Sequence, residues 1–132
     1  MIIRYIVCTQ TLVKKSMHRA GTTKNRRPYL YLDRQYDAWE KDAAKQVAIQ
    51  LTENGFPCVE YKCWAKITVY RRGHTECDLL GPWESIFDVL QRSGAVRNDK
   101  LIKSTDGSRV YHGVEAGTER FEVVLAPFME EE

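Results

Sequence analysis

An alternation of side-chain types between Val59 and Val69 is the feature that most constrains how this chain can fold. The odd positions are apolar, aromatic or small: Val59, Tyr61, Cys63, Ala65, Ile67 and Val69. The even positions include Glu60, Lys62, Lys66 and Thr68. Successive side chains of a strand point to opposite faces of a sheet, so this period of two predicts a half-buried strand. The strand is expected to end at Arg71, Arg72 and Gly73.

Two helical patterns lie on either side of this strand. The first covers about residues 34–54, with Asp33 as N-cap, Gly55 as the stop, and apolar residues at helical spacing: Tyr36, Trp39, Ala43, Val47 and Leu51. The second begins near Pro82, presents Trp83, Ile86, Phe87 and Leu90 on one face, and ends at Gly94. Further strands are expected over 2–8 and near 101–103, 109–112 and 120–125. The expected fold class is α+β, a mixed β-sheet with two main helices packed on it.

The overall composition indicates one soluble globular domain, residues 1–132. Hydrophobic residues make up 43% of the chain and charged residues 29%, which excludes disordered and low-complexity classes. The apolar runs are too short to cross a bilayer, so we expect a cytoplasmic protein with no membrane partner. The four cysteines form no Cys-x-x-Cys pair and are expected to be reduced and mostly buried. A Gly-rich phosphate loop is missing, so no nucleotide cofactor is expected.

Charge is distributed unevenly along the chain. Residues 1–32 contain no acidic residue and seven basic ones: Arg4, Lys14, Lys15, Arg19, Lys24, Arg26 and Arg27. Most of these fall in a basic loop expected over residues 9–32, together with Ser, Thr, Asn and His donors. This composition is typical of segments that contact phosphate oxygens without reading bases, so the predicted partner is a polyanion. The acidic tail, residues 129–132, is expected to be a frayed end.

Acidic residues in the second half of the chain are the candidates for a metal site. Cleavage of a phosphodiester commonly uses Mg²⁺ held by carboxylates from the ends of different elements. The candidates are Glu76, Asp78, Glu84, Asp88 and Asp99. Each has a plainer interpretation: an exposed helix face for Glu84 and Asp88, turn chemistry for Asp99, and helix-dipole stabilisation for Glu76 and Asp78. His74 and His112 lack a partner at a diagnostic spacing and are discounted as general bases.

Taken together, these motifs resemble the RusA-type Holliday junction resolvases, small phage and prophage endonucleases, over nearly the whole chain. The resemblance is carried by Tyr36-Asp37-Ala38-Trp39-Glu40, by Arg71-Arg72, and above all by the segment from Leu80 to Asp99, with Gly81-Pro82, Phe87-Asp88-Val89-Leu90-Gln91 and Gly94-Ala95-Val96-Arg97-Asn98-Asp99. It implies a homodimer in a bacterial or phage-infected cell. Such a protein binds four-way junctions or other branched DNA and nicks opposed strands with Mg²⁺, in recombination and repair.

Transferred to this sequence, the resemblance implies Glu76, Asp78 and Asp99 as metal ligands and Asp88 as a further catalytic residue. The expected DNA contacts are Lys14, Lys15, Arg19, Lys24, Arg26, Arg27, Arg71 and Arg72. The family's Asp-x-Asp-Asn motif is replaced here by Glu76-Cys77-Asp78-Leu79. Either Glu76 and Asp78 stand for the acid pair, or Thr75 and Cys77 fall on the ligand positions and Asp78 on the Asn.

In either register, Glu84 replaces a catalytic Lys that the family places on the second helix. Three functions therefore remain open. The first is an active Mg²⁺-dependent endonuclease. The second is a RusA-like protein that binds branched DNA without efficient cleavage. The third is an interaction protein whose basic loop contacts an acidic protein.

Overall fold

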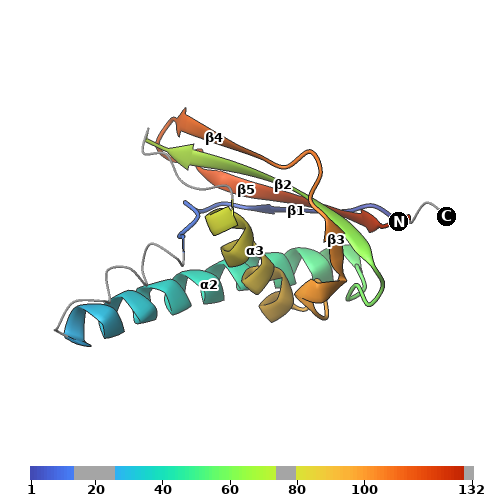
Figure 1. Cartoon of the computed structure of the whole chain (residues 1–132), viewed down its shortest axis with the longest axis horizontal. Helices are drawn as coiled ribbons and strands as arrows, with labels where there is room; N and C mark the ends of the chain where they lie inside the picture. The colour runs from blue at the N-terminus through green and yellow to red at the C-terminus, as the bar shows by residue number, and fades with distance from the viewer. Residues whose placement is uncertain (14–25, 74–79, 130–132) are drawn as a thin grey trace.

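A computed structural model describes residues 1–13, 26–73 and 80–129, with the backbone alone at 26–33 and 80. The elements follow in the order β1 (Ile3–Val7), α2 (Arg26–Asn54), β2 (Cys63–Arg72), α3 (Leu80–Ser93), the 3₁₀ turn η1 (Asp99–Leu101), β3 (Ile102–Ser104), β4 (Arg109–Val114) and β5 (Arg120–Pro127). Both helices lie on the same side of the sheet (Figure 1). The prediction of an α+β fold with two main helices on a mixed sheet is confirmed.

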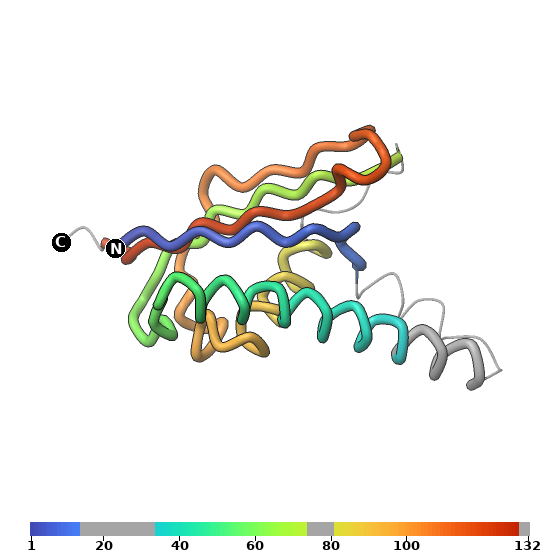
Figure 2. The backbone as a smooth tube through the Cα atoms, turned by 180° about the vertical axis from the view of Figure 1, so that it is seen from behind, coloured from blue at the N-terminus to red at the C-terminus, as the bar shows by residue number. Residues whose placement is uncertain are grey.

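The sheet has five strands in the order β1-β5-β2-β3, and β4 pairs with the same edge of β2 as β3 does. The pairs β1–β5 and β5–β2 are antiparallel, whereas β2 pairs with β3 and β4 in parallel. Parallel neighbours need a crossover connection, and α3 supplies it between β2 and β3. Seen from behind in Figure 2, α2 runs alongside β1 on the helix side of the sheet.

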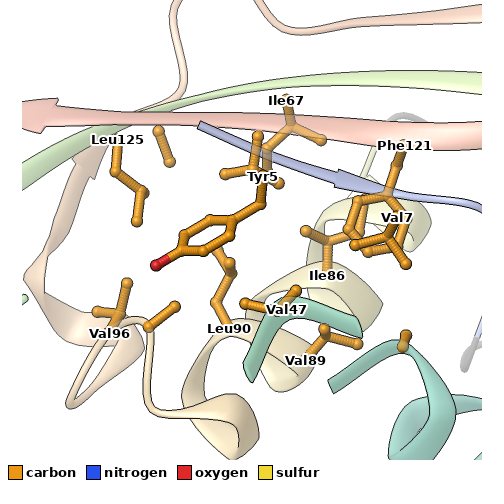
Figure 3. Close-up of a cluster of buried hydrophobic side chains, with 14 of the residues drawn as sticks. Tyr5, Val7, Val47, Ile67, Ile86, Val89, Leu90, Val96, Phe121 and Leu125 are labelled. Atoms are coloured by element: carbon orange, nitrogen blue, oxygen red, sulfur yellow. The ribbon is translucent and has the colours of Figure 1, made fainter. Parts of the chain in front are cut away.

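The core lies between the sheet and the two helices (Figure 3). Alternate residues of β1, β2 and β5 are fully or almost fully buried, which is the pattern of a sheet with one covered face. Among the largest buried side chains are Tyr5, Phe121, Ile67, Ile86 and Leu90. The apolar residues predicted for one face of the second helix contact this core: Trp83, Ile86 and Leu90 are buried in it, and the half-buried Phe87 packs against it.

The outer edge of β1 is covered by two glutamines of α2. Gln50 accepts a hydrogen bond from the Ile6 N–H at 3.0 Å and donates one to the Ile6 carbonyl at 2.7 Å. One turn earlier, Gln46 makes the same pair of bonds with Cys8, at 2.9 and 3.3 Å. An edge strand presents unpaired backbone groups, and here two side-chain amides satisfy them as a neighbouring strand would.

Two predicted boundaries are wrong. The first long helix begins at Arg26 and not near residue 34, so Asp33 is no N-cap and the predicted loop over 9–32 ends early. Pro28 falls in the first turn of this helix, where backbone N–H groups have no intrahelical acceptor, so proline does not break it. The long strand begins at Cys63, and Val59 makes only an isolated bridge to Val96.

The expectation that the cysteines are mostly buried is also wrong. Cys63 is buried, whereas Cys8 and Cys58 are exposed. Cys77 lies outside the described residues, as do Glu130, Glu131 and Glu132 of the acidic tail. In the described part of the chain, neither helix is long and apolar enough to span a bilayer.

Candidate functional site

The residues that follow β1 are held against the end of β2. The Gln10 side chain accepts a hydrogen bond from the Arg72 N–H at 2.9 Å and donates one to the Arg72 carbonyl at 3.3 Å. The Arg71 guanidinium donates to the Thr11 carbonyl at 2.7 Å. The exit of β1 is therefore tied to the last two residues of β2 through both backbone and side chains.

A close contact joins the same segment to the first turn of α3. A Cβ atom added to Gly81 would lie 2.5 Å from Cγ1 of Val13, closer than real Cβ contacts come. Only glycine therefore lets Val13 pack directly on this turn. We call Gln10, Thr11, Val13, Arg71, Arg72 and Gly81 the anchor region.

The anchor region fixes where the two charged segments of the sequence leave the fold. Residues 14–25 begin directly after Val13, and residues 74–79 lie between the end of β2 and the start of α3. The basic and the acidic segments thus depart from one place. The predicted site residues Lys14, Lys15, Arg19, Lys24, Glu76 and Asp78 lie outside the described residues, and the side chains of Arg26 and Arg27 are likewise not described.

The two described DNA-contact candidates have different surroundings. Arg71 is half-buried, and its Nε atom is buried without a hydrogen-bond partner in the described part of the chain. Arg72 is exposed at the end of β2. Hydrogen bonds from the backbone N–H groups of Glu119 and Gly117 lower the pKa of the Glu119 carboxyl, and the charge of Arg72 contributes less. Arg71 therefore has a positioning role toward Thr11, whereas Arg72 is open to solvent.

Asp88, the predicted catalytic residue on α3, lies beside α2. The Tyr36 hydroxyl donates a hydrogen bond to its Oδ2 atom at 3.1 Å. Burial raises the pKa of Tyr36 above its usual value, so this hydroxyl remains a donor through the neutral pH range. The half-buried Asp88 carboxylate is thereby oriented by a tyrosine that the sequence pattern assigned to the core.

An open pocket of about 350 Å³ lies between α2 and α3 and is lined by Glu40, Asp88, Gln91 and Arg92. We call it the helix pocket. Arg92 forms ion pairs with Asp37 at 2.9 Å and with Glu40 at 3.4 Å, so the Glu40 charge already has a partner. The pocket combines carboxylates, an amide and a guanidinium, a mixture that suits a polar ligand better than an apolar one.

Asp99 lies in the η1 turn that follows α3 and is bonded to one residue of the helix pocket. Its backbone N–H donates to Oε1 of Gln91 at 3.2 Å, and Asn98 caps the short η1 turn through a bond from the Lys100 N–H at 2.9 Å. Gln91 lies about three turns beyond Leu80, which is about 16 Å along the axis of α3. Asp99 therefore sits at the opposite end of α3 from the anchor region.

Of the four predicted catalytic acids, the structure describes Asp88 on α3 and Asp99 in the η1 turn that follows it, and it describes neither Glu76 nor Asp78. Within the described ranges, no three His, Cys, Asp or Glu side chains gather in a way that could hold a metal ion. Because Glu76 and Asp78 lie outside these ranges, the Mg²⁺ ligand set of Glu76, Asp78 and Asp99 stays a prediction. Glu84 is exposed, as the plainer interpretation predicts.

Sequence reasoning did not propose Tyr36, Glu40 or Arg92 as site residues. Tyr36 follows the apolar period of its helix and was assigned to the core, while Glu40 and Arg92 have the charge and spacing of ordinary helix-surface residues. Their common pocket depends on how α2 packs on α3, and no local pattern carries that information.

No protein-family model matches the chain, and no curated protein matches it. The fold class therefore rests on the structure itself, an α+β domain with an anchor region at one end of α3 and a polar pocket near the other.

Proposed function

We propose that this chain is a Mg²⁺-dependent, structure-selective endonuclease that binds Holliday junctions or other branched DNA as a homodimer. The proposal combines the sequence resemblance with one structural observation. The anchor region makes the basic segment and the acidic segment leave the fold from a common place. A nuclease needs this proximity, because the groups that bind phosphates must lie next to those that hold the metal ion.

The proposed roles are those that the sequence resemblance implies. Lys14, Lys15, Arg19, Lys24, Arg26, Arg27 and Arg72 contact the DNA backbone, while Glu76, Asp78 and Asp99 hold Mg²⁺. Asp88, oriented by Tyr36, supports the metal site from α3. Arg71 acts indirectly, because its bond to the Thr11 carbonyl fixes the start of the basic segment.

The position of Asp99 sets a condition on this assignment. Asp99 binds Gln91 near the C-terminal end of α3, whereas the acidic segment joins α3 at its N-terminal end. A shared metal ion therefore requires Asp99 and the acidic segment to be brought together, either within one chain or between two copies.

The test uses a labelled synthetic four-way junction and a linear duplex of the same sequence, with Mg²⁺ or with EDTA. We expect symmetric nicking of the junction alone, in Mg²⁺ alone. Asp99→Asn should reduce nicking by at least about 100-fold, the scale of losing one electrostatic group, while junction affinity persists. Asp106→Asn makes the same charge change at an exposed loop residue and should leave nicking intact. Equal loss in both variants would refute the role of Asp99.

DNA binding has its own test. Exchanging Lys14, Lys15, Arg26 and Arg27 for glutamine removes up to four phosphate contacts. The slope of log affinity against log salt should then become shallower by up to about 4, because each contact contributes about 0.9. An unchanged slope would place the DNA-binding surface elsewhere.

A second candidate function is branched-DNA binding without efficient cleavage. It is favoured by the exposed Glu84 in the first turns of α3, where the resemblance leads us to expect a lysine near the scissile phosphate. A junction-specific gel shift with no nicking in Mg²⁺ would select this function. Restored nicking in Glu84→Lys would then identify the missing cation.

A further inference from the structure

The face of the sheet that points away from the helices carries a stacked row of side chains. Tyr70 of β2 is in register with Arg120 of β5 on one side and with Tyr111 of β4 on the other. The Tyr70 and Tyr111 rings are stacked, with centroids 5.3 Å apart and planes 15° from parallel. The Arg120 guanidinium lies 3.9 Å from the Tyr70 ring centroid, in cation–π geometry.

This row ends at an open position. Tyr111 lies on β4, which has β2 on one side and no strand on the other within the described residues. One ring face of Tyr111 contacts Tyr70, yet 43% of the residue is exposed. A further planar group can therefore continue the stack at Tyr111.

Positive side chains surround the row on the same face. Besides Arg120 of the row itself, they are Arg4, Lys66 and Arg109. Arg4 and Lys66 alternate with buried residues of their strands, and Arg109 pairs with the outward-facing Thr68. The facing carboxylate, Glu122, is held between Arg4 and Arg120. Hydrogen bonding to Arg4, with a smaller contribution from Arg120, keeps the pKa of Glu122 below its usual value. Its negative charge is thus compensated, and the exposed lysine and arginines leave the face positive.

We propose that this outer face binds a single-stranded segment of DNA, with one base stacked on Tyr111 and phosphates contacting Lys66 and Arg109. A planar base fits the end of an aromatic row, and positive groups beside it fit the backbone. A duplex does not fit, because its base faces are covered by their neighbours in the stack. The choice of DNA over other single strands rests on the proposed function, since branched DNA exposes unpaired segments.

The outer face is separate from the anchor region and the helix pocket, which lie on the helix side or at the end of the sheet. Binding here therefore requires neither Mg²⁺ nor the acidic residues. It would hold an unpaired strand of a branched substrate on one side of the sheet while the junction contacts the other. This separation allows the two proposals to be tested independently.

The test measures fluorescence anisotropy of a labelled, unbranched oligo(dT) in EDTA, with duplex DNA as competitor. Tyr111→Ala should weaken oligo(dT) binding by about 5- to 150-fold, the range expected for one stacked base, and Tyr111→Phe should bind within about twofold of the unaltered protein. Tyr61→Ala is the matched control, because Tyr61 is 41% exposed but lies outside the stacked row. Arg109→Gln should reduce the salt slope by about 1 without removing an aromatic ring.

Several results would overturn the inference. The first is unchanged oligo(dT) affinity in both Tyr111→Ala and Arg109→Gln, and the second is an equal loss in Tyr61→Ala. A third is a Tyr111→Ala variant with unchanged oligo(dT) affinity but a changed molar mass in light scattering. That result would assign the face to a second copy of the chain. Junction binding without any oligo(dT) affinity would refute this inference alone, whereas oligo(dT) binding without junction binding or nicking would refute the proposed function alone.

Discussion

Replacing Gln50 by alanine should destabilise the protein by an amount that the structure fixes. The substitution removes the bonds of 3.0 and 2.7 Å to the N–H and carbonyl of Ile6. It also removes a 3.2 Å bond from Nε2 to the Gln46 carbonyl, which is left out of the sum because that carbonyl is also the i−4 acceptor of the Gln50 N–H in the helix. At about 1 kcal/mol for each hydrogen bond, the loss is about 2 kcal/mol. Water can reach this edge and replaces part of the loss, and alanine is the better helix former by a few tenths of a kcal/mol. We therefore expect Gln50→Ala to lower the free energy of unfolding by about 1 to 1.5 kcal/mol.

Urea unfolding followed by circular dichroism measures this loss, and a fall in Tm of about 5 °C should accompany it. Gln35→Ala is the matched control, because it makes the same change at an exposed position of the same helix. Gln50→Glu keeps the shape of the side chain but turns a carboxylate oxygen toward the Ile6 carbonyl, so it should destabilise at least as much at pH 7. If Gln50→Ala is no less stable than Gln35→Ala, the glutamine contributes nothing to holding the edge.

Two further predictions concern packing and ionisation. Gly81→Ala should lower the free energy of unfolding by about 1 to 3 kcal/mol, because the added Cβ would clash with Val13. In urea unfolding, the double variant with Val13→Ala should recover most of that loss. Equal losses in the single and double variants would exclude the clash. Burial raises the pKa of Tyr5 to about 12, so its proton stays bound in the folded protein while the unfolded chain releases it at about pH 10. The free energy of unfolding should therefore fall as pH rises from about 10 to 12, and it should fall less steeply in Tyr5→Phe. Parallel pH profiles of the two proteins would contradict this prediction.

Local sequence patterns predicted the elements that have strong periodicity or clear stop signals. The alternation along β2 and the apolar face of α3 both reflect burial against one layer, so each pattern records its own environment. Gly94 ends the second helix with a φ of +84°, a conformation that glycine adopts without strain. These features depend on a few neighbouring residues, which is why the sequence alone reveals them.

The first turns of α2 were missed for a physical reason. The expected start at residue 34 relied on the apolar period, which begins at Tyr36, and on Pro28 and the basic residues as signs of a loop. A helix needs no buried face in its first turns, and proline is tolerated where N–H groups lack acceptors. Composition thus identified the charged character of this segment but not its backbone conformation.

The anchor region, the helix pocket and the stacked row all depend on contacts between residues distant in sequence. Gln10 meets Arg72, Tyr36 meets Asp88, and Tyr70 meets Tyr111 only because strand register and helix packing bring them together. A periodic pattern specifies which face of an element is buried, but it does not specify which residue of another element lies opposite. The acids Asp88 and Asp99 could be proposed from their residue type, whereas their neighbours could not.

The glutamines along β1 also limit how copies of this protein can assemble through their sheets. Over Ile6 and Cys8 the outer edge of β1 is already paired, so in the described part of the chain a new strand finds free backbone groups along β3 and β4. If two copies joined through that edge, the continuous sheet would end on both sides in a β1 strand whose outer backbone groups at Ile6 and Cys8 are occupied. A further strand would then find fewer free backbone groups on β1, which disfavours growth beyond two copies.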